Sequence, residues 1–386
     1  MITPGTIKIR RLTESDIEEL RNFHRRREDI QQPEVADRIV QLIEWFAFSY
    51  PLSRGEAAYY VAEENGKIIA TLGRLPTEFS VNGKYLKGYY IHNLHVDVGS
   101  RREGLGFDLV MSLSQKVEDE SEYFFCMFAL SPINYRMQKR RKYVVLPPAP
   151  MYFRPVTTYQ QVRAIVRNRL LARVISPFAE MTLNLADLLL FSFSRSDGDV
   201  MSIERFDSRF DEFNRKILPR VGVSTVKSST YLNWKYIDRP FRTEKVLAVE
   251  RNGELKGFVV LSVFPFKKKF RRGWIVEILA DPDDIPAISA LCKASIRYFK
   301  NAKVDTVQCI LTDERFTRVL KKFMFRKGSG VGEPVLLGNL DKCQSEKDYL
   351  SEIRNWHFTY GERASYFLKP ELLTTVRAKS ANRESL

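Results

Sequence analysis

The first third of the chain alternates between two hydrophobic periods, and each period predicts a different element. Residues 7–12 and 57–75 show strand-like alternation, whereas residues 35–48 place apolar side chains at helical spacing. Asn65 and Gly66 split 57–75 into two strands, because this pair tolerates the positive φ of a tight hairpin turn. The order predicted so far is strand, helices and hairpin.

The next segment continues this pattern towards a sheet flanked by helices. Residues 88–96 and 122–130 read as buried strands. Between them, Leu105, Leu109, Leu113 and Val117 recur every fourth residue, as on one face of a helix.

The same pattern returns in the second half of the chain. Residues 246–263 again form strand, Asn-Gly turn and strand, 273–281 parallel 88–96, and 304–311 parallel 122–130. We therefore predict an α/β fold of two tandem domains, each a mixed, mostly antiparallel twisted sheet flanked by helices. The predicted boundaries are an N-terminal domain at 1–155, a helical connector at 156–230, a C-terminal domain at 231–375 and a flexible tail at 376–386.

The charge composition indicates an anionic binding partner but does not identify it. The 62 Lys and Arg residues exceed the 47 Asp and Glu residues, and the net charge of +15 favours an anionic partner such as a nucleotide cofactor, an acidic polymer or a lipid headgroup. The 4 cysteines form no Cys-x-x-Cys pair, and residues 1–12 lack the apolar core of a signal peptide. We expect a soluble, cytoplasmic protein.

One apolar segment needs separate treatment. Residues 175–193 approach the length of a membrane span, but Pro177, Glu180 and Asp187 interrupt them. We expect a buried helix, with transient contact to a membrane surface as the alternative.

The junction at residues 92–110 carries the most specific chemistry. A strand end followed by a helix start leaves N–H groups unpaired, and the helix dipole attracts phosphate there. Gly104 and Gly106 would let a bulky anion approach the backbone, while Arg101 and Arg102 add charged donors. The spacing R-x-x-G-x-G fits neither the dinucleotide fingerprint nor the P-loop, so a different diphosphate ligand is expected.

This junction resembles the acetyl-coenzyme A signature of the Gcn5-related N-acetyltransferase (GNAT) superfamily, in which a strand L-x-V precedes [RQ]-x-x-G-x-[GA]. Leu94 and Val96 fit the strand, and residues 101–106 fit the loop. The resemblance implies acetyl-CoA as co-substrate. No metal is expected, because His24 and His357 are remote from the junction and leave no apparent set of metal ligands. The resemblance assigns cofactor contacts to Leu94, Val96, Val98, Arg101, Arg102, Glu103, Gly104, Leu105, Gly106 and, after the following strand, Asn134.

The implied reaction is direct attack of an amine on the thioester, which needs a base and an acid. His92 is the candidate base, because it precedes Leu94 by two residues and should share its strand face, with His95 on the other face. Tyr135 is the nearest hydroxyl to the position where the family places its acid, although the surrounding motif departs from the family pattern. A water is the alternative acid.

The second copy lacks the phosphate loop, because ADPDDIPAI stands in its place and carboxylates repel a diphosphate. We expect this copy to have kept the fold and lost the cofactor. Glu277 occupies the place of His92, and Trp234 lies in a W-K-Y segment that resembles tandem acetyltransferase-like proteins of cell-envelope synthesis. Both residues are therefore assigned to an acceptor site.

These features predict an N-acyltransferase that moves an acetyl or other acyl group from acetyl-CoA to a primary amine, such as an amino sugar or a cell-envelope precursor. One alternative is aminoacyl transfer from aminoacyl-tRNA in cell-wall synthesis. Another is a non-catalytic basic module that binds nucleic acid or membrane, of which nucleic acid is the less expected partner. The acceptor, the acyl length and the oligomeric state stay open.

Overall fold

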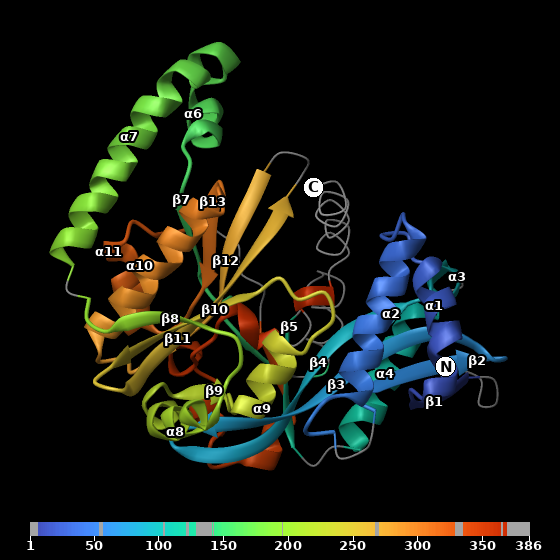
Figure 1. Ribbon diagram of the computed structural model, residues 1–386. Helices are drawn as coiled ribbons and strands as arrows, with labels where there is room; N and C mark the ends of the chain where they lie inside the picture. Colours follow the sequence, from blue (N-terminus) through green and yellow to red (C-terminus); the bar gives the residue numbers. More distant parts are fainter. Residues whose placement is uncertain are drawn as a thin grey trace.

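A computed structural model describes residues 7–53, 57–102, 105–120, 123–128, 141, 143–194, 196–266, 270–328, 335–363 and 366–368. Within these ranges the chain forms two mostly antiparallel sheets, each flanked by helices (Figure 1). The predicted fold class is confirmed. Both Asn-Gly turns are also confirmed, since Asn65, Gly66, Asn252 and Gly253 all have positive φ.

The strands of the two sheets have the following order. Among the described residues, the first sheet runs β1 (Ile7–Arg11), β2 (Tyr59–Glu64), β3 (Lys67–Val81), β4 (Lys84–Val96), β5 (Phe124–Phe128), β15 (Val335–Gly338) and β6 (Val144–Leu146), and β9 (Val223–Thr225) pairs with β3. The second runs β14 (Arg326–Lys327), β7 (Met151–Pro155), β13 (Thr306–Ile310), β12 (Phe270–Ala280), β11 (Glu254–Phe266), β10 (Lys245–Arg251) and β8 (Asp199–Ile203).

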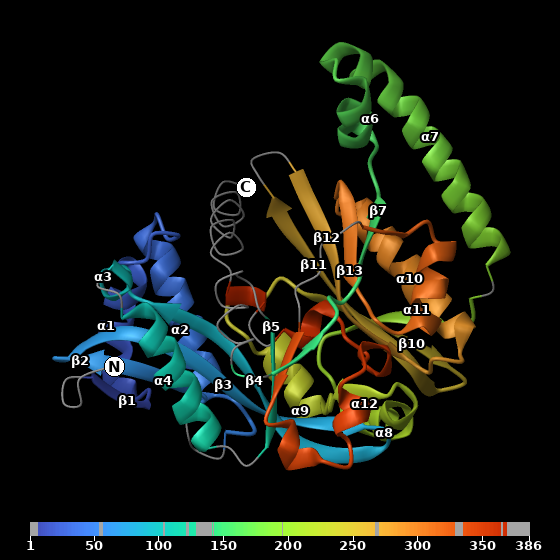
Figure 2. The same ribbon diagram turned by 180° about the vertical axis from the view of Figure 1, so that it is seen from behind.

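Helices cover both faces of each sheet. Those of the first half are α1 (Ile17–Arg25), α2 (Pro33–Phe48), α3 (Val98–Arg102) and α4 (Gly106–Asp119). Those that follow are α6 (Tyr159–Val166), α7 (Arg169–Phe193), α8 (Ser208–Ile217), α9 (Ser229–Leu232), α10 (Ile285–Asn301), α11 (Glu314–Lys322) and α12 (Lys347–Leu350). Helices α1 and α2 lie on one face of the first sheet and α4 on the other, as the opposite views in Figures 1 and 2 show.

Strand pairing crosses the boundaries that we predicted. β7, from the end of the N-terminal range, pairs with β13, and β8, from the connector range, pairs with β10. In return, β15 from the C-terminal range pairs with β5 in the first sheet. Each sheet therefore contains strands from both halves of the chain, so the two halves are interlocked.

A continuous apolar core joins the sheets. It includes Phe46 of α2, Phe79 of β3, Phe258 of β11 and Trp356 near the C-terminus, all almost completely buried. Two smaller cores lie on the outer faces, one under α4 and one under α10 and α11.

The expectation of a buried helix at 175–193 is wrong. Helix α7 exposes large apolar side chains along its length, including Phe178, which is 65% exposed, and Leu185, which is 56% exposed. Within the described part of the chain, α7 is the one helix that is long and apolar enough to cross a membrane by length and composition.

Candidate functional site

The loop after β4 is organised by the buried carboxylate of Asp97. One oxygen accepts a hydrogen bond from Arg26 Nε at 3.1 Å, and the other accepts from the Gly99 amide at 2.9 Å. The Asp97 amide donates to the Ile69 carbonyl at 2.7 Å. These bonds hold the end of β4 against α1 and start α3, which points the chain towards α4.

Backbone bonds within this loop use two of the amides expected for the diphosphate. The Arg101 amide donates to the Asp97 carbonyl, and the Leu105 amide donates to the Ser100 carbonyl. The Arg101 side chain is 52% exposed and lies 3.9 Å from Glu28, so its guanidinium is accessible to an anion. Glu103, Gly104 and the side chain of Arg102 lie outside the described residues.

Gly106 begins α4 beside the Arg101 side chain. A Cβ at this position would lie 3.2 Å from Arg101 Cγ, closer than side chains normally pack. The glycine therefore allows Arg101 to fold back over the start of the helix. The approach of an anion to this glycine stays a prediction.

The pairing of β4 with β5 is described for the part of β4 that lies before this loop. Parallel pairing runs from Gly88 with Phe124 to Ile91 with Met127, whereas β4 itself continues to Val96. Within the described part of the chain, residues 92–96 of β4 have no strand partner on this side. An extended ligand could pair with them there.

An extra residue in β4 changes which side chains share a face. Gly73 pairs with His92 and Thr71 with His95, so two residues of β4 oppose one of β3, and Asn93 has a φ of 51°. This is a β-bulge, and it reverses the alternation beyond it. Leu94 and Val96 consequently pack towards the α4 side, whereas His92 faces α2.

The expectation that His92 and Leu94 share a face is therefore wrong, as is the expectation that His95 lies opposite His92. His95 lies near His24 of α1, with ring centroids 6.4 Å apart. The bulge could not be recognised from period-two alternation alone, although an Asn inside a strand is a signal for it.

His92 lies in an aromatic environment. Its ring is 4.3 Å from that of Phe46, and its nitrogens have no hydrogen-bond partner among the described residues. Burial lowers the pKa of His92 to about 3, so the imidazole is neutral at physiological pH. A Cβ on Gly73 would collide with this ring, so the glycine makes room for it.

Asn134 and Tyr135 lie outside the described residues. Their assigned roles, pantetheine contact for Asn134 and general acid for Tyr135, stay predictions.

Trp234 belongs to an aromatic cluster that sequence reasoning missed. Its indole stacks on Trp45 of α2 with centroids 4.5 Å apart, and Tyr50 and Phe46 lie within 4.7 and 5.5 Å. Phe367 closes the cluster, 6.1 Å from Trp45. We call Trp45, Phe46, Tyr50, Trp234 and Phe367 the aromatic cluster; His92 lies at its edge through Phe46.

Glu277 does not face an open cleft, contrary to expectation. It is 2% exposed, accepts a hydrogen bond from Thr359 Oγ1 at 2.8 Å and lies 3.9 Å from Lys227 Nζ. Burial raises its pKa, and the Lys227 ammonium opposes that shift.

The same lysine forms a buried ion pair with Glu362 at 2.6 Å. Tyr90 of β4 also donates to Glu362, at 2.7 Å. Burial alone would raise the pKa of Glu362, but Lys227 outweighs it and holds the value low. Glu277, Lys227 and Glu362 are thus a structural link between the sheets.

The C-terminal segment fills the corresponding opening in the second sheet. Pairing of β12 with β13 ends at Ile275 with Cys309, as it does between β4 and β5. Beyond that point His357 Nε2 donates to the Ile278 carbonyl at 2.9 Å, and the Phe358 amide donates to Thr312 Oγ1 at 2.9 Å. Residues 356–361 therefore occupy the space between the two strand ends.

The start of α10 is likewise occupied. Asp284 caps the helix by accepting from the Ala287 amide at 3.0 Å, and Asp283 pairs with Arg220 at 2.7 Å. In the part of the chain that is described, no group of three or more His, Cys, Asp or Glu side chains could hold a metal ion.

Residues 8–143 match the family model of the acetyltransferase (GNAT) domain. Among solved structures, the chain is similar to N-myristoyltransferase from Saccharomyces cerevisiae with bound myristoyl-CoA, at 13% identity and a TM-score of 0.54, covering 87% of this chain and 83% of that one. It is also similar to GCN5-related N-acetyltransferases from Anabaena variabilis, at 11% identity and TM-score 0.57 over 86% and 72% of the two chains, and from Kribbella flavida, at 12% and 0.57 over 86% and 70%. No curated protein sequence matches the chain significantly.

The family match places an acetyltransferase domain of the GNAT type in the N-terminal part of the chain, and the fold of the chain is similar to that of GNAT-type acyltransferases. The match covers the N-terminal part of the chain, residues 8–143, whereas the similarity of fold extends over both sheets.

Proposed function

We propose that this protein transfers an acyl group from acyl-CoA, with acetyl-CoA as the first candidate, to a primary amine. The observation that carries the proposal is the R-x-x-G-x-G pattern between the end of β4 and the start of α4, inside the region that matches the GNAT family model. A protein with a similar fold is known with bound myristoyl-CoA, which supports an acyl-CoA donor.

In the proposed reaction the amine nitrogen attacks the thioester carbonyl. A C–N bond forms, the C–S bond breaks, the amine loses a proton and the coenzyme A thiolate gains one. The loop residues Leu94, Val96, Val98 and 101–106 are proposed to hold the coenzyme, with Asn134 on the pantetheine arm.

We keep His92 as the proposed base, acting through a water. Its buried ring is a weak base while its pKa is about 3, so it serves best when the acceptor arrives as a neutral amine or brings water to the imidazole. Tyr135 or a second water is the proposed acid.

The acceptor is proposed to lie beside the aromatic cluster, because His92 borders it through Phe46. Trp234 is buried and stacks on Trp45, so the partly exposed Trp45 is the member of the cluster proposed to contact a sugar ring or an apolar chain, which fits an amino sugar or a cell-envelope precursor. Glu277 is no longer part of this site, because its carboxylate is buried and bonded.

Titration calorimetry with acetyl-CoA and with longer acyl-CoA tests the proposal and ranks the donors. Arg101→Ala should weaken binding by about 1.5–3 kcal/mol, the loss of one charge-assisted hydrogen bond. The matched control is Arg205→Ala. Arg205 is also an exposed arginine with an acidic partner, Asp238, and it lies outside the proposed coenzyme loop. Absence of binding in the wild type, or equal affinity in both variants, would contradict the proposal.

A further inference from the structure

Helix α7 carries an apolar face that points away from the protein. Leu170, Val174, Phe178, Met181, Leu185 and Leu188 follow one another at intervals of three or four residues, and all are exposed. This spacing places them on one side of the helix, in a stripe roughly 27 Å long at 1.5 Å per residue.

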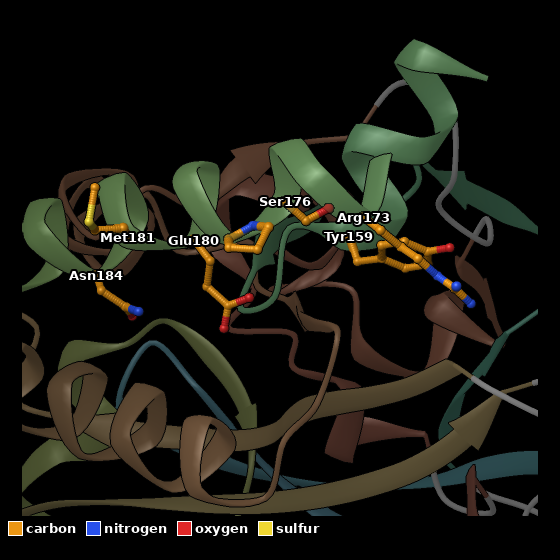
Figure 3. Close-up of a pocket in the computed structure, with 7 residues that line it drawn as sticks. Tyr159, Arg173, Ser176, Glu180, Met181 and Asn184 are labelled. Atoms are coloured by element: carbon orange, nitrogen blue, oxygen red, sulfur yellow. The ribbon is translucent and has the colours of Figure 1, made fainter. Parts of the chain in front are cut away.

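The polar side of α7 faces the protein instead. Asp187 is buried and pairs with Arg154 of β7 and with Lys300 of α10, the latter at 2.6 Å. Lys300 also donates to Asn184 Oδ1 at 2.8 Å. Figure 3 shows Glu180 and Asn184 pointing from α7 towards the body of the protein, whereas Met181 points away from it. These three residues are among those that line a pocket of about 480 Å³. An ordinary surface helix turns its apolar side to the protein and its polar side to water, whereas α7 is held in the reverse orientation.

The position of α7 makes this face accessible. Together with α6 it extends beyond the second sheet as an arm, on the opposite side of the molecule from α1 to α4 (Figures 1 and 2). The apolar stripe therefore does not belong to the acyl-CoA site.

Arginines gather where α6 meets α7. Arg163, Arg167, Arg169 and Arg173 lie within eleven residues of the chain, and none forms an ion pair with an acidic side chain in the described ranges. A flat apolar stripe bordered by arginines is the pattern of a helix that lies in the interface of an anionic membrane.

We propose that the α6–α7 arm docks on the surface of an anionic lipid bilayer, with α7 parallel to the membrane and its apolar stripe among the acyl chains. A second copy of the chain would bring the same excess of arginine to the contact, whereas anionic headgroups would neutralise it. Crossing the membrane would require α7 to break the buried pair between Asp187 and Arg154.

Vesicle flotation of the full chain tests this proposal, with vesicles of phosphatidylglycerol and phosphatidylcholine compared with vesicles of phosphatidylcholine alone. The triple variant Phe178→Glu, Met181→Glu, Leu185→Glu should lower partitioning onto anionic vesicles about tenfold or more, because it places charge in the acyl region. The matched control Leu52→Glu, Tyr85→Glu, Tyr123→Glu makes the same charge change at other exposed apolar positions and should bind more strongly than the α7 variant. Circular dichroism verifies that both variants are folded.

A second variant tests the role of charge. Arg163→Gln, Arg167→Gln, Arg169→Gln should reduce the preference for anionic over neutral vesicles about tenfold or more. Release of bound protein by alkaline carbonate would support surface docking, and resistance to release would overturn it in favour of a span. Equal partitioning of the α7 variant and its control, or wild-type dimers that the α7 variant dissociates without any vesicle binding, would also overturn it.

Discussion

At the residue scale, the backbone conformation of Asn93 determines which face of the sheet His92 occupies. Its positive φ inserts one extra residue into β4, and this turns His92 towards Phe46 while Leu94 and Val96 turn towards α4. The candidate base and the side chains of Leu94 and Val96, which are proposed to contact the coenzyme, therefore lie on opposite faces of the sheet. Any proton transfer by His92 must occur on the α2 side of the sheet, where the aromatic cluster lies.

Burial of His92 predicts a stability that falls in acid. Its pKa is lowered to about 3 in the folded chain, against about 6.5 for an unfolded histidine, so the unfolded state binds the proton first as the pH falls below 6.5. Between pH 7 and pH 5 this histidine should cost about 2 kcal/mol of unfolding free energy. Urea denaturation of the wild type and of His92→Gln at both pH values checks this. The loss of unfolding free energy between pH 7 and pH 5 should be smaller in His92→Gln by about that amount.

The imidazole signal of His92 in NMR should accordingly show no titration above pH 5. A midpoint near 6.5 would contradict the buried environment. Once an acceptor is known, a turnover of His92→Gln equal to that of the wild type would exclude His92 as the base.

The buried lysine predicts a second effect at this scale. Lys227→Met leaves Glu362 without its cation in the core, which should cost about 3–5 kcal/mol of unfolding free energy. Lys84→Met is the control, because Lys84 pairs with Glu346 at the surface and its loss should cost about 1 kcal/mol or less. Equal losses in urea denaturation would show that the Lys227 pair contributes no more than a surface pair.

At the element scale, the two copies share strands and helices but differ at the same two places. The first copy offers an exposed Arg101 and, among the described residues, no strand partner for residues 92–96 on the β5 side, whereas the second has Asp284 bonded to the start of α10 and residues 356–361 between β12 and β13. The proposed coenzyme site therefore has no counterpart at the equivalent position of the second copy.

This difference predicts one acyl-CoA per chain. Asp281 and Asp283 are paired with Arg220 and Asp284 bonds the Ala287 amide, so the start of α10 offers a diphosphate no free donors from these groups, and the segment at 356–361 excludes the pantetheine arm. Calorimetry should therefore give a stoichiometry near one, and Arg101→Ala should weaken that single site. A stoichiometry of two, or a single site that Arg101→Ala leaves unchanged, would contradict this assignment.

At the scale of the whole molecule, strand exchange joins the halves into one unit. β15 pairs with both β5 and β6, and β7 pairs with both β13 and β14. A chain cut near residue 155 would leave β5 with an open edge and remove β15 from the first sheet. Neither half should be stable alone.

The interlocked sheets predict a single cooperative unfolding transition. Leu337 of β15 is fully buried, and Leu337→Ala should destabilise the chain by about 2–5 kcal/mol. Far-UV circular dichroism and tryptophan fluorescence should shift together in urea, because Trp45 and Trp274 report on different halves. Val200→Ala, at an exposed position of β8, is the control and should change little. Separate transitions, of which only one moved in Leu337→Ala, would contradict the cooperative unit.

The sequence by itself determined the features that depend on near neighbours in the chain. Both Asn-Gly hairpins and the repeated order of strands and helices follow from local periodicity and turn chemistry, and the R-x-x-G-x-G junction follows from side chains within six residues. Only the tertiary structure decided which strands exchange, which way His92 faces, that Glu277 is buried and that α7 is exposed. The reason is that a stripe of apolar residues specifies one face of a helix but not what covers it, and a carboxylate is buried or exposed according to residues far away in sequence, such as Lys227 and Thr359 for Glu277.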